Sequence, residues 1–224
     1  MDPILVVLVI VGVIALGIYS LVQDRKRKRL LRAFARSQGL AYHDGRETGW
    51  EHEYPAFKVL DRGNSRQSKL HLEGERDGRH VRCLDYRFTT GSGKNRKTHR
   101  RSLVVLGTGT PVIPLRIRPE HIFDKVGEFL GLDDLDFESS EFSRRFHVSS
   151  ADRKWAYAVI HPRLMEYLLT LPGDVRVEFG FQELAVIRDG ALTATRCHRD
   201  LKTATRVLEL VPEDVLAELR GETP

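Results

Sequence analysis

An uncharged apolar run near the N-terminus constrains this chain most. The segment ILVVLVIVGVIALGIYSLV, residues 4–22, holds 19 residues without a charge. As a helix that rises about 1.5 Å per residue it would span about 28 Å, close to the ~30 Å hydrocarbon core of a bilayer. We therefore predict a transmembrane helix within residues 1–23.

The charges on either side of this run favour a retained membrane span over a cleaved signal peptide. A signal peptide carries positive charge before its apolar run and small residues at a cleavage site after it. Here Met1-Asp2-Pro3 precedes the run, and five consecutive basic residues follow it. These are Arg25, Lys26, Arg27, Lys28 and Arg29. By the positive-inside rule we expect a single-pass protein of the inner (plasma) membrane, with its N-terminus outside and its C-terminal domain in the cytoplasm.

The five basic residues have two compatible interpretations. They set the topology of the span, and they attract anionic lipid head groups by about 1 kcal/mol each, or about 5 kcal/mol together. The expected partners are thus the lipid bilayer, its anionic head groups and an unidentified protein. The helix is expected to continue through a basic juxtamembrane segment, residues 24–38, with Leu30, Leu31 and Phe34 on its apolar side and Gly39 as its stop signal.

The net charge of +5 comes from this juxtamembrane segment. Between Asp24 and Arg36 there are seven basic residues against one acid, whereas the chain from Ser37 onward carries 29 of each sign. A neutral folded part lacks the electrostatic footprint of a nucleic-acid-binding protein. We therefore exclude nucleic acid as a partner.

Residues 39–224 predict an α+β domain with a largely antiparallel sheet and packed helices. Residues 69–88 have the alternation of a hairpin around Asp77-Gly78, residues 89–100 are expected to be a flexible loop, and residues 49–118 together suggest the sheet. Helices are expected at residues 118–131, 200–211 and 212–219, with Pro119, Asp200 and Pro212 as start signals.

The stretch FHVSSADRKWAYAVIHPRLMEYLL, residues 146–169, is rich in polar and aromatic side chains. Ser149 and Asp152 have the spacing of a helix capping box, and Pro162 suits the start of a second helix. Because these residues already have structural roles, we interpret the stretch as scaffold. The alternative is a membrane-anchored hydrolase whose site is assembled from His147, Asp152 and His161.

The remaining motifs assign no chemistry. GSGKN, residues 91–95, lacks the earlier glycine and the Ser or Thr of a phosphate loop. The nine histidines show no metal-ligand spacing, so no cofactor, metal ligand or catalytic residue is predicted. Cys83 and Cys197 favour reduced, buried thiols over a disulfide scaffold, although a single bridge between them stays open.

The segment from Glu138 to Met165 resembles the signature of a bacterial family, typical of actinobacteria, of membrane-anchored proteins with a domain of unknown function. The matching residues are Glu138, Ser139, Phe142, Ser143, Phe146, Val148, Asp152, Ala156, Tyr157, His161, Pro162, Arg163, Leu164 and Met165. Ser143 departs from the asparagine that is more usual there. The resemblance implies a single N-terminal span and supplies no catalytic residues.

Together these patterns predict a membrane-tethered cytoplasmic module that binds a protein or lipid-surface partner. A non-enzymatic role is favoured over the hydrolase. A deep cleft with converging polar groups would favour an enzyme instead.

Overall fold

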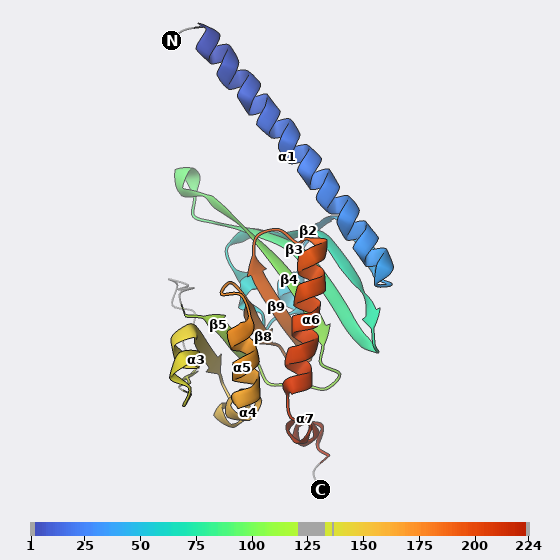
Figure 1. Cartoon of the computed structure of the whole chain (residues 1–224), viewed down its shortest axis with the longest axis vertical. Helices are drawn as coiled ribbons and strands as arrows, with labels where there is room; N and C mark the ends of the chain where they lie inside the picture. Colours follow the sequence, from blue (N-terminus) through green and yellow to red (C-terminus); the bar gives the residue numbers. More distant parts are fainter. Residues whose placement is uncertain (1–2, 121–132, 136, 223–224) are drawn as a thin grey trace.

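The computed structural model describes residues 3–120, 133–135 and 137–222. Its first element, α1 (Pro3–Ser37), is one unbroken helix that projects away from an α+β domain (Figure 1). The expected membrane span and the juxtamembrane segment therefore form a single rod. Within the described residues, α1 is the one helix long and apolar enough to cross a membrane, and its apolar window has no residue buried inside the protein.

The end of α1 follows from its sequence. Gly39 adopts a φ of 69°, and the Leu40 amide donates to the Ala35 carbonyl at 2.8 Å. A positive φ favours glycine, so the predicted stop signal is confirmed. The expected apolar side is corrected in one place. Leu31 is fully buried, whereas Leu30 is 52% exposed and Ala35 takes its place against the domain.

The domain is built on one antiparallel sheet with the strand order β1-β2-β3-β4-β9-β8-β5-β7-β6. All neighbouring strands pair antiparallel, which confirms the predicted α+β class with a largely antiparallel sheet. The strands are β1 (Ala41–Glu47), β2 (Asn64–Arg76), β3 (Arg79–Thr90), β4 (Lys97–Gly107), β5 (Leu115–Pro119), β6 (Asp133–Asp134), β7 (Phe146–Ser150), β8 (Arg176–Phe179) and β9 (Glu183–Asp189).

The sequence predicted one hairpin turn correctly and underestimated the length of the next hairpin. The β2–β3 turn lies at Asp77-Gly78, whose φ angles of 52° and 71° fit a tight hairpin turn, as predicted. The next hairpin is longer than expected, because Thr90 pairs with Lys97 and Arg87 pairs with Arg100 across β3 and β4. The loop predicted over residues 89–100 therefore shrinks to its middle, since the partner strand supplies backbone hydrogen bonds to a polar segment.

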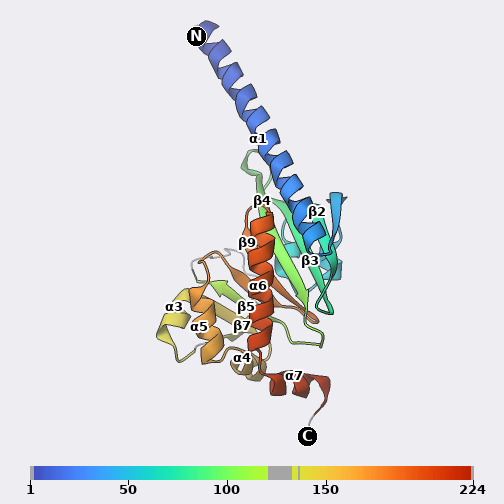
Figure 2. The ribbon, with the colours of Figure 1, turned by 45° about the vertical axis from the view of Figure 1, so that its right-hand side comes forward.

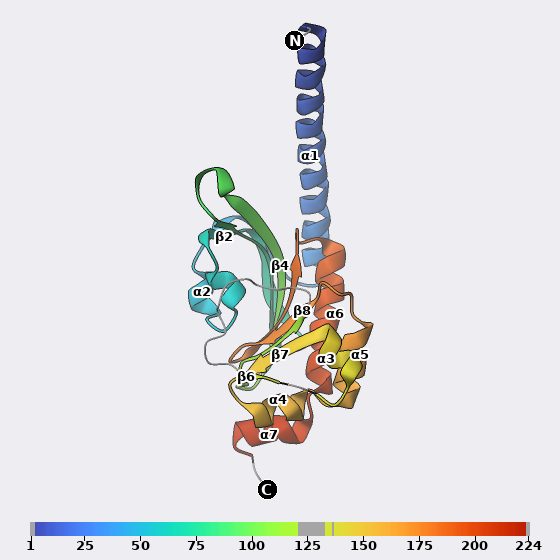
Figure 3. The same cartoon turned by 90° about the vertical axis from the view of Figure 1, so that its left-hand side faces the viewer.

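Helices cover both faces of the sheet unequally (Figure 3). The short α2 (Trp50–Glu53) and a 3-10 turn η1 (Lys58–Asp61) cover one face of the sheet. The helices α3 to α7 cover the other face. These are α3 (Ser140–Arg145), α4 (Arg153–Val159), α5 (Pro162–Thr170), α6 (Ala194–Leu210) and α7 (Glu213–Arg220). The C-terminal half of α1 packs beside α6 on the same face (Figure 2).

Three predicted helix starts are wrong. Asp152, not Ser149, is the N-cap of α4, and its carboxylate accepts from the Trp155 amide at 2.9 Å while Ser149 stays in β7. The helix expected from Asp200 begins earlier, at the Thr193 cap, because Asp200 is paired with Arg188 inside the core.

The third wrong start is that of the helix predicted over residues 118–131. Its intended first residue, Pro119, belongs to β5, where it pairs with Phe146 of β7. The predicted residues 121–131 lie outside the described part of the chain.

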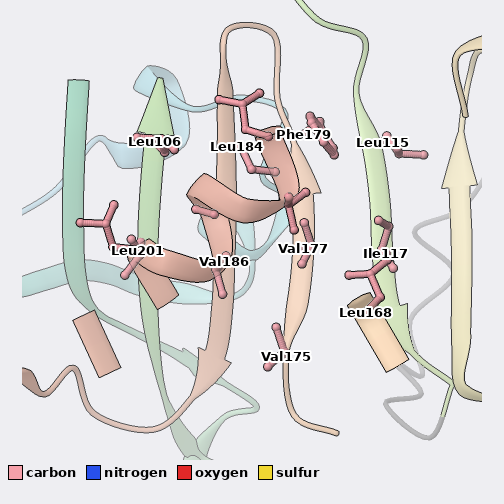
Figure 4. Close-up of a cluster of buried hydrophobic side chains, with 14 of the residues drawn as sticks. Leu106, Leu115, Ile117, Leu168, Val175, Val177, Phe179, Leu184, Val186 and Leu201 are labelled. Carbon is pink, nitrogen blue, oxygen red and sulfur yellow. The ribbon is translucent and has the colours of Figure 1, made fainter. Parts of the chain in front are cut away.

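The main hydrophobic core lies between the sheet and the long helices (Figure 4). Val177 and Val186 of neighbouring strands face Leu168 of α5 and Leu201 of α6 in this cluster. The buried leucines of α5, Leu164 and Leu168, lie on its core-facing side, and the helix begins at Pro162 as predicted.

The two cysteines meet in the core. Both are free and buried, in agreement with the predicted reduced thiols, and their side chains are neighbours. Burial, with the Cys83 thiol alongside, raises the pKa of Cys197 well above its usual value.

Candidate functional site

The juxtamembrane part of α1 is locked to the sheet by a buried carboxylate. Asp85 of β3 is fully buried, and its Oδ2 lies 3.0 Å from Arg27 Nη1. Arg100 of β4 donates from Nε to Asp85 Oδ1 at 2.7 Å, and Arg27 also donates to the Leu192 carbonyl at 2.9 Å. Two guanidinium groups thus neutralise one buried acid. This arrangement joins the helix that precedes the domain to the centre of the sheet.

A second carboxylate ties α1 to the edge strand. Asp44 of β1 accepts from Lys28 Nζ at 2.8 Å and from Arg32 Nη2 at 3.0 Å. These ion pairs are partly exposed, so they contribute less than the buried one. With Arg27 also engaged, two of the five residues predicted to face the membrane instead contact the domain. Their role in positioning α1 could not be predicted, because the acids that hold them lie on distant strands.

The other three residues of the basic run are free to face lipid. Arg25, Lys26 and Arg29 lie on exposed positions of α1 directly after the apolar run. A second exposed basic group lies at the turn between β3 and β4, where Lys94, Arg96 and Lys97 follow one another closely. This turn points toward the same side of the molecule as the N-terminal half of α1 (Figures 1 and 3).

Basic side chains also crowd between these two groups. The Arg87 guanidinium, together with burial, lowers the pKa of Lys69, and burial next to Arg100 lowers the pKa of Arg87. The neighbouring positive charge is the largest cause for Lys69, whereas burial is the largest cause for Arg87. A hollow of about 360 Å³ lies alongside, where Tyr19 and Gln23 of α1 approach Arg100.

We call these exposed or half-buried cations the membrane-proximal basic face. Its members are Arg25, Lys26, Arg29, Lys69, Arg87, Lys94, Arg96 and Lys97. The helix α7 lies at the opposite end of the molecule from the N-terminus (Figure 1). Its exposed acids Glu213 and Glu218 are paired with Arg220 and Lys154. The exposed cations of the membrane-proximal basic face, by contrast, lie at the end of the domain from which the apolar half of α1 projects.

The residues proposed for a hydrolase are not brought together. Asp152 and His161 lie at opposite ends of α4, and Asp152 is occupied as the cap of that helix. His147 lies in β7 between Phe146 and Val148, which face the main core, so its own side chain faces the other side of the sheet.

His161 has a structural partner. Its Nε2 donates to the Leu210 carbonyl at 2.7 Å, which ties the start of α5 to the end of α6. Hollows of about 670 and 730 Å³ border the ring on either side. Because neither Asp152 nor His147 lines them, these hollows do not assemble the proposed hydrolase residues.

One group of side chains in the described part of the chain has metal-ligand chemistry. His43 of β1, His71 of β2 and Glu73 of β2 place their ligand atoms within 4.8 Å of one another. This group has no characteristic spacing in the sequence, because its members come from two strands. They are brought together by the pairing of His43 with His71.

Comparison with known proteins identifies a similar fold but no family. No family model and no curated protein matches the sequence. Among solved structures, the crystal structure of the mycobacterial trehalose monomycolate transport factor A, TtfA, is similar to this chain, with a TM-score of 0.66 at 14% sequence identity. The match covers 86% of this chain and 97% of that one. At this identity the likeness shows a shared fold.

Proposed function

We propose that this protein is a single-pass membrane protein whose C-terminal domain is a binding module held against the cytoplasmic surface of the bilayer. The observation that carries the proposal is the continuity of α1. The apolar helix runs without a break into a segment that packs on the sheet through Leu31, Ala35 and the Arg27–Asp85 ion pair. A rigid connection of this kind gives the domain a fixed orientation to the membrane.

The orientation of the span is proposed from its flanking charges. Basic residues follow the apolar run and an acid precedes it, so the positive-inside rule puts the domain in the cytoplasm of a bacterial cell, at the inner membrane. A reporter fused after Pro224 should then be active only in the cytoplasm. Activity only on the other side of the membrane would contradict this orientation.

The proposed partner of the membrane-proximal basic face is a surface of anionic lipid head groups. Three exposed cations of α1 contribute about 3 kcal/mol, less than the ~5 kcal/mol expected from five, because Arg27 and Lys28 are engaged by the domain. The three cations of the β3–β4 turn add a similar amount. This attraction is reversible and screened by salt, whereas the apolar span anchors the chain by itself.

The fold supports a role at a membrane rather than in the bulk cytoplasm. The similar solved structure is that of a transport factor for trehalose monomycolate. We extend from it only the class of function, a membrane-associated binding module in lipid handling. We also propose membership of the bacterial family of membrane-anchored proteins whose signature the segment from Glu138 to Met165 resembles.

The lipid-surface proposal is tested on a fragment of residues 24–224, which keeps Arg27, Leu31 and Ala35. The fragment should be soluble at physiological salt and should bind anionic vesicles more tightly than neutral ones. Replacing Lys94, Arg96 and Lys97 by Gln should weaken the binding by at least about 10-fold, because about 3 kcal/mol of attraction is removed. Vesicle co-sedimentation measures the change.

A matched control removes the same charge from the far end of the molecule. Lys154, Arg206 and Arg220 are near α7 and pair with acids there. Their replacement by Gln should leave vesicle binding nearly unchanged. Equal losses in both triple variants would mean that net charge, not an oriented face, governs binding. Quantitative sedimentation in high salt would instead reveal an apolar docking surface on the domain.

A further inference from the structure

A pair of stacked histidines lies at the edge of the sheet, on the face opposite α1. His43 and His71 are cross-strand partners of β1 and β2, with ring centroids 4.4 Å apart and an angle of 7° between the ring planes. Glu73 lies one residue pair further along the same face. Its Oε1 is 3.0 Å from His43 Nε2, and its Oε2 is 4.0 Å from His71 Nε2. The ligand atoms of the three side chains lie within 4.8 Å of one another. Because the two rings are stacked, the half-exposed His43 ring has to turn for both imidazole nitrogens to reach one ion.

A fourth residue fixes the orientation of His71. Its Nδ1 lies 3.0 Å from Oε2 of Glu47, so that carboxylate is placed to hold the ring with its Nε2 on the side of Glu73. This is the carboxylate–histidine arrangement that orients metal-binding imidazoles in proteins. The Trp50 ring packs against His71 edge to face, at 5.2 Å between centroids, and holds the ring from the other side.

The surroundings leave room for an ion and for water. His43, His71, Glu47 and Glu73 line an open hollow of about 380 Å³. His43 has 46% of its side chain exposed and is free to turn. A tetrahedral ion with bonds of about 2.0–2.1 Å separates its ligand atoms by about 3.3 Å, close to the 3.0 and 4.0 Å found here.

We propose that His43, His71 and Glu73 form a binding site for a divalent transition metal ion of the Zn²⁺ type, with Glu47 as the residue that positions His71. Two histidines and one carboxylate leave the fourth position of a tetrahedral ion to water. Any proton on the ligand nitrogens is released when the ion binds, so the affinity of the site should rise with pH.

Arg82 sets a limit on the affinity of the site. Its Nη2 lies 2.7 Å from Glu73 Oε2, so part of the negative charge of that carboxylate is already balanced. Glu53 and Tyr54 also bind Arg82, which gives the guanidinium partners to keep if Glu73 turns toward an ion. A bound ion would connect the edge strand β1 to β2 and so brace the strand whose Asp44 holds α1.

The test uses the full-length protein in detergent, prepared without a polyhistidine tag and stripped with a chelator. Titration with ZnCl₂ in a calorimeter should show one site per chain. His43→Asn should weaken Zn²⁺ binding by more than about 10-fold, and Glu47→Gln should weaken it by about 10- to 100-fold through His71 alone. Co²⁺ should give the intense visible absorption of a four-coordinate site in the wild type and lose it in His43→Asn.

His80→Asn is the matched control, because it removes an exposed imidazole from β3 outside the cluster. It should leave Zn²⁺ binding unchanged. Since His43 is half exposed, its variant keeps the fold, and an unchanged unfolding temperature of the metal-free protein checks this. The proposal is overturned if the wild type binds no Zn²⁺, or if His43→Asn and His80→Asn bind it as the wild type does.

Discussion

At the scale of single residues, burial decides which ion pairs hold the membrane helix to the domain. Asp85 and Asp44 each bind two cations, and each reaches α1 through one or both of them. Asp85 is fully buried, whereas the side chain of Asp44 is 31% exposed. An uncompensated charge in a protein interior is costly, but a cation left unpaired at a surface is solvated by water.

These two acids give a matched pair of substitutions. Asp85→Ala should destabilise the domain by about 3–5 kcal/mol, because Arg27 and Arg100 lose the buried carboxylate that offsets them. Asp44→Ala removes as many ion pairs and should cost less than about 1 kcal/mol. Urea unfolding of the 24–224 fragment measures both. Equal costs would show that the Arg27–Asp85 connection is no stronger than a surface contact.

At the scale of elements, α1 serves both as an anchor and as a part of the core. Its apolar half has the composition of a membrane span, and its second half buries Leu31 and Ala35 against the sheet beside α6. The same helix therefore changes its surroundings from lipid to protein within a few turns. The change falls at the basic run, where Arg27 and Lys28 turn to the domain and their neighbours remain exposed.

Adjacent leucines test this packing. Leu31→Ala should destabilise the 24–224 fragment by about 2–5 kcal/mol, as expected for a large-to-small change in a core. Leu30→Ala should change the stability by no more than about 0.5 kcal/mol, since that side chain is 52% exposed. Thermal or urea unfolding of the two variants gives the comparison. A Leu31→Ala cost as small as that of Leu30→Ala would mean that α1 is not docked in solution.

Elements with strong local signals were predictable from the sequence, and elements defined by distant partners were not. The long apolar helix, the Asp77-Gly78 turn and the Gly39 stop each depend on residues that are contiguous in the sequence, and all three are found. The start of α6 was predicted wrongly because an aspartate such as Asp200 is a common helix N-cap. In the structure Asp200 instead forms a buried ion pair with Arg188 of β9.

The same limit applies to the candidate sites. Arg25 to Arg29 were identified by their sequence, but their division between membrane and domain depends on Asp85 and Asp44, which lie on other strands. The basic β3–β4 turn was interpreted only as a loop, because its direction follows from the twist and register of two long strands. The His43–His71 pair exists only through strand pairing, so no spacing rule could find it.

At the scale of the whole molecule, the N-terminal half of α1 and the β3–β4 turn lie toward one end, and α7 lies at the other (Figure 1). Lys94, Arg96 and Lys97 of the turn are exposed, whereas Glu213 and Glu218 of α7 are paired with Arg220 and Lys154. A membrane with anionic head groups would therefore attract the near end, which adds an electrostatic torque to the mechanical constraint of α1. We thus expect one preferred orientation, with the β3–β4 turn at the lipid surface.

Distances from the lipid surface test this orientation most directly. A neutral fluorophore is attached to Asn95→Cys in the β3–β4 turn or to Asp214→Cys in α7, in full-length protein reconstituted into anionic vesicles. The native thiols, Cys83 and Cys197, are buried and do not compete for the label. With a quencher on the lipid head groups, the account predicts strong quenching at position 95 and little at position 214. Equal quenching at the two positions, or stronger quenching at position 214, would contradict it.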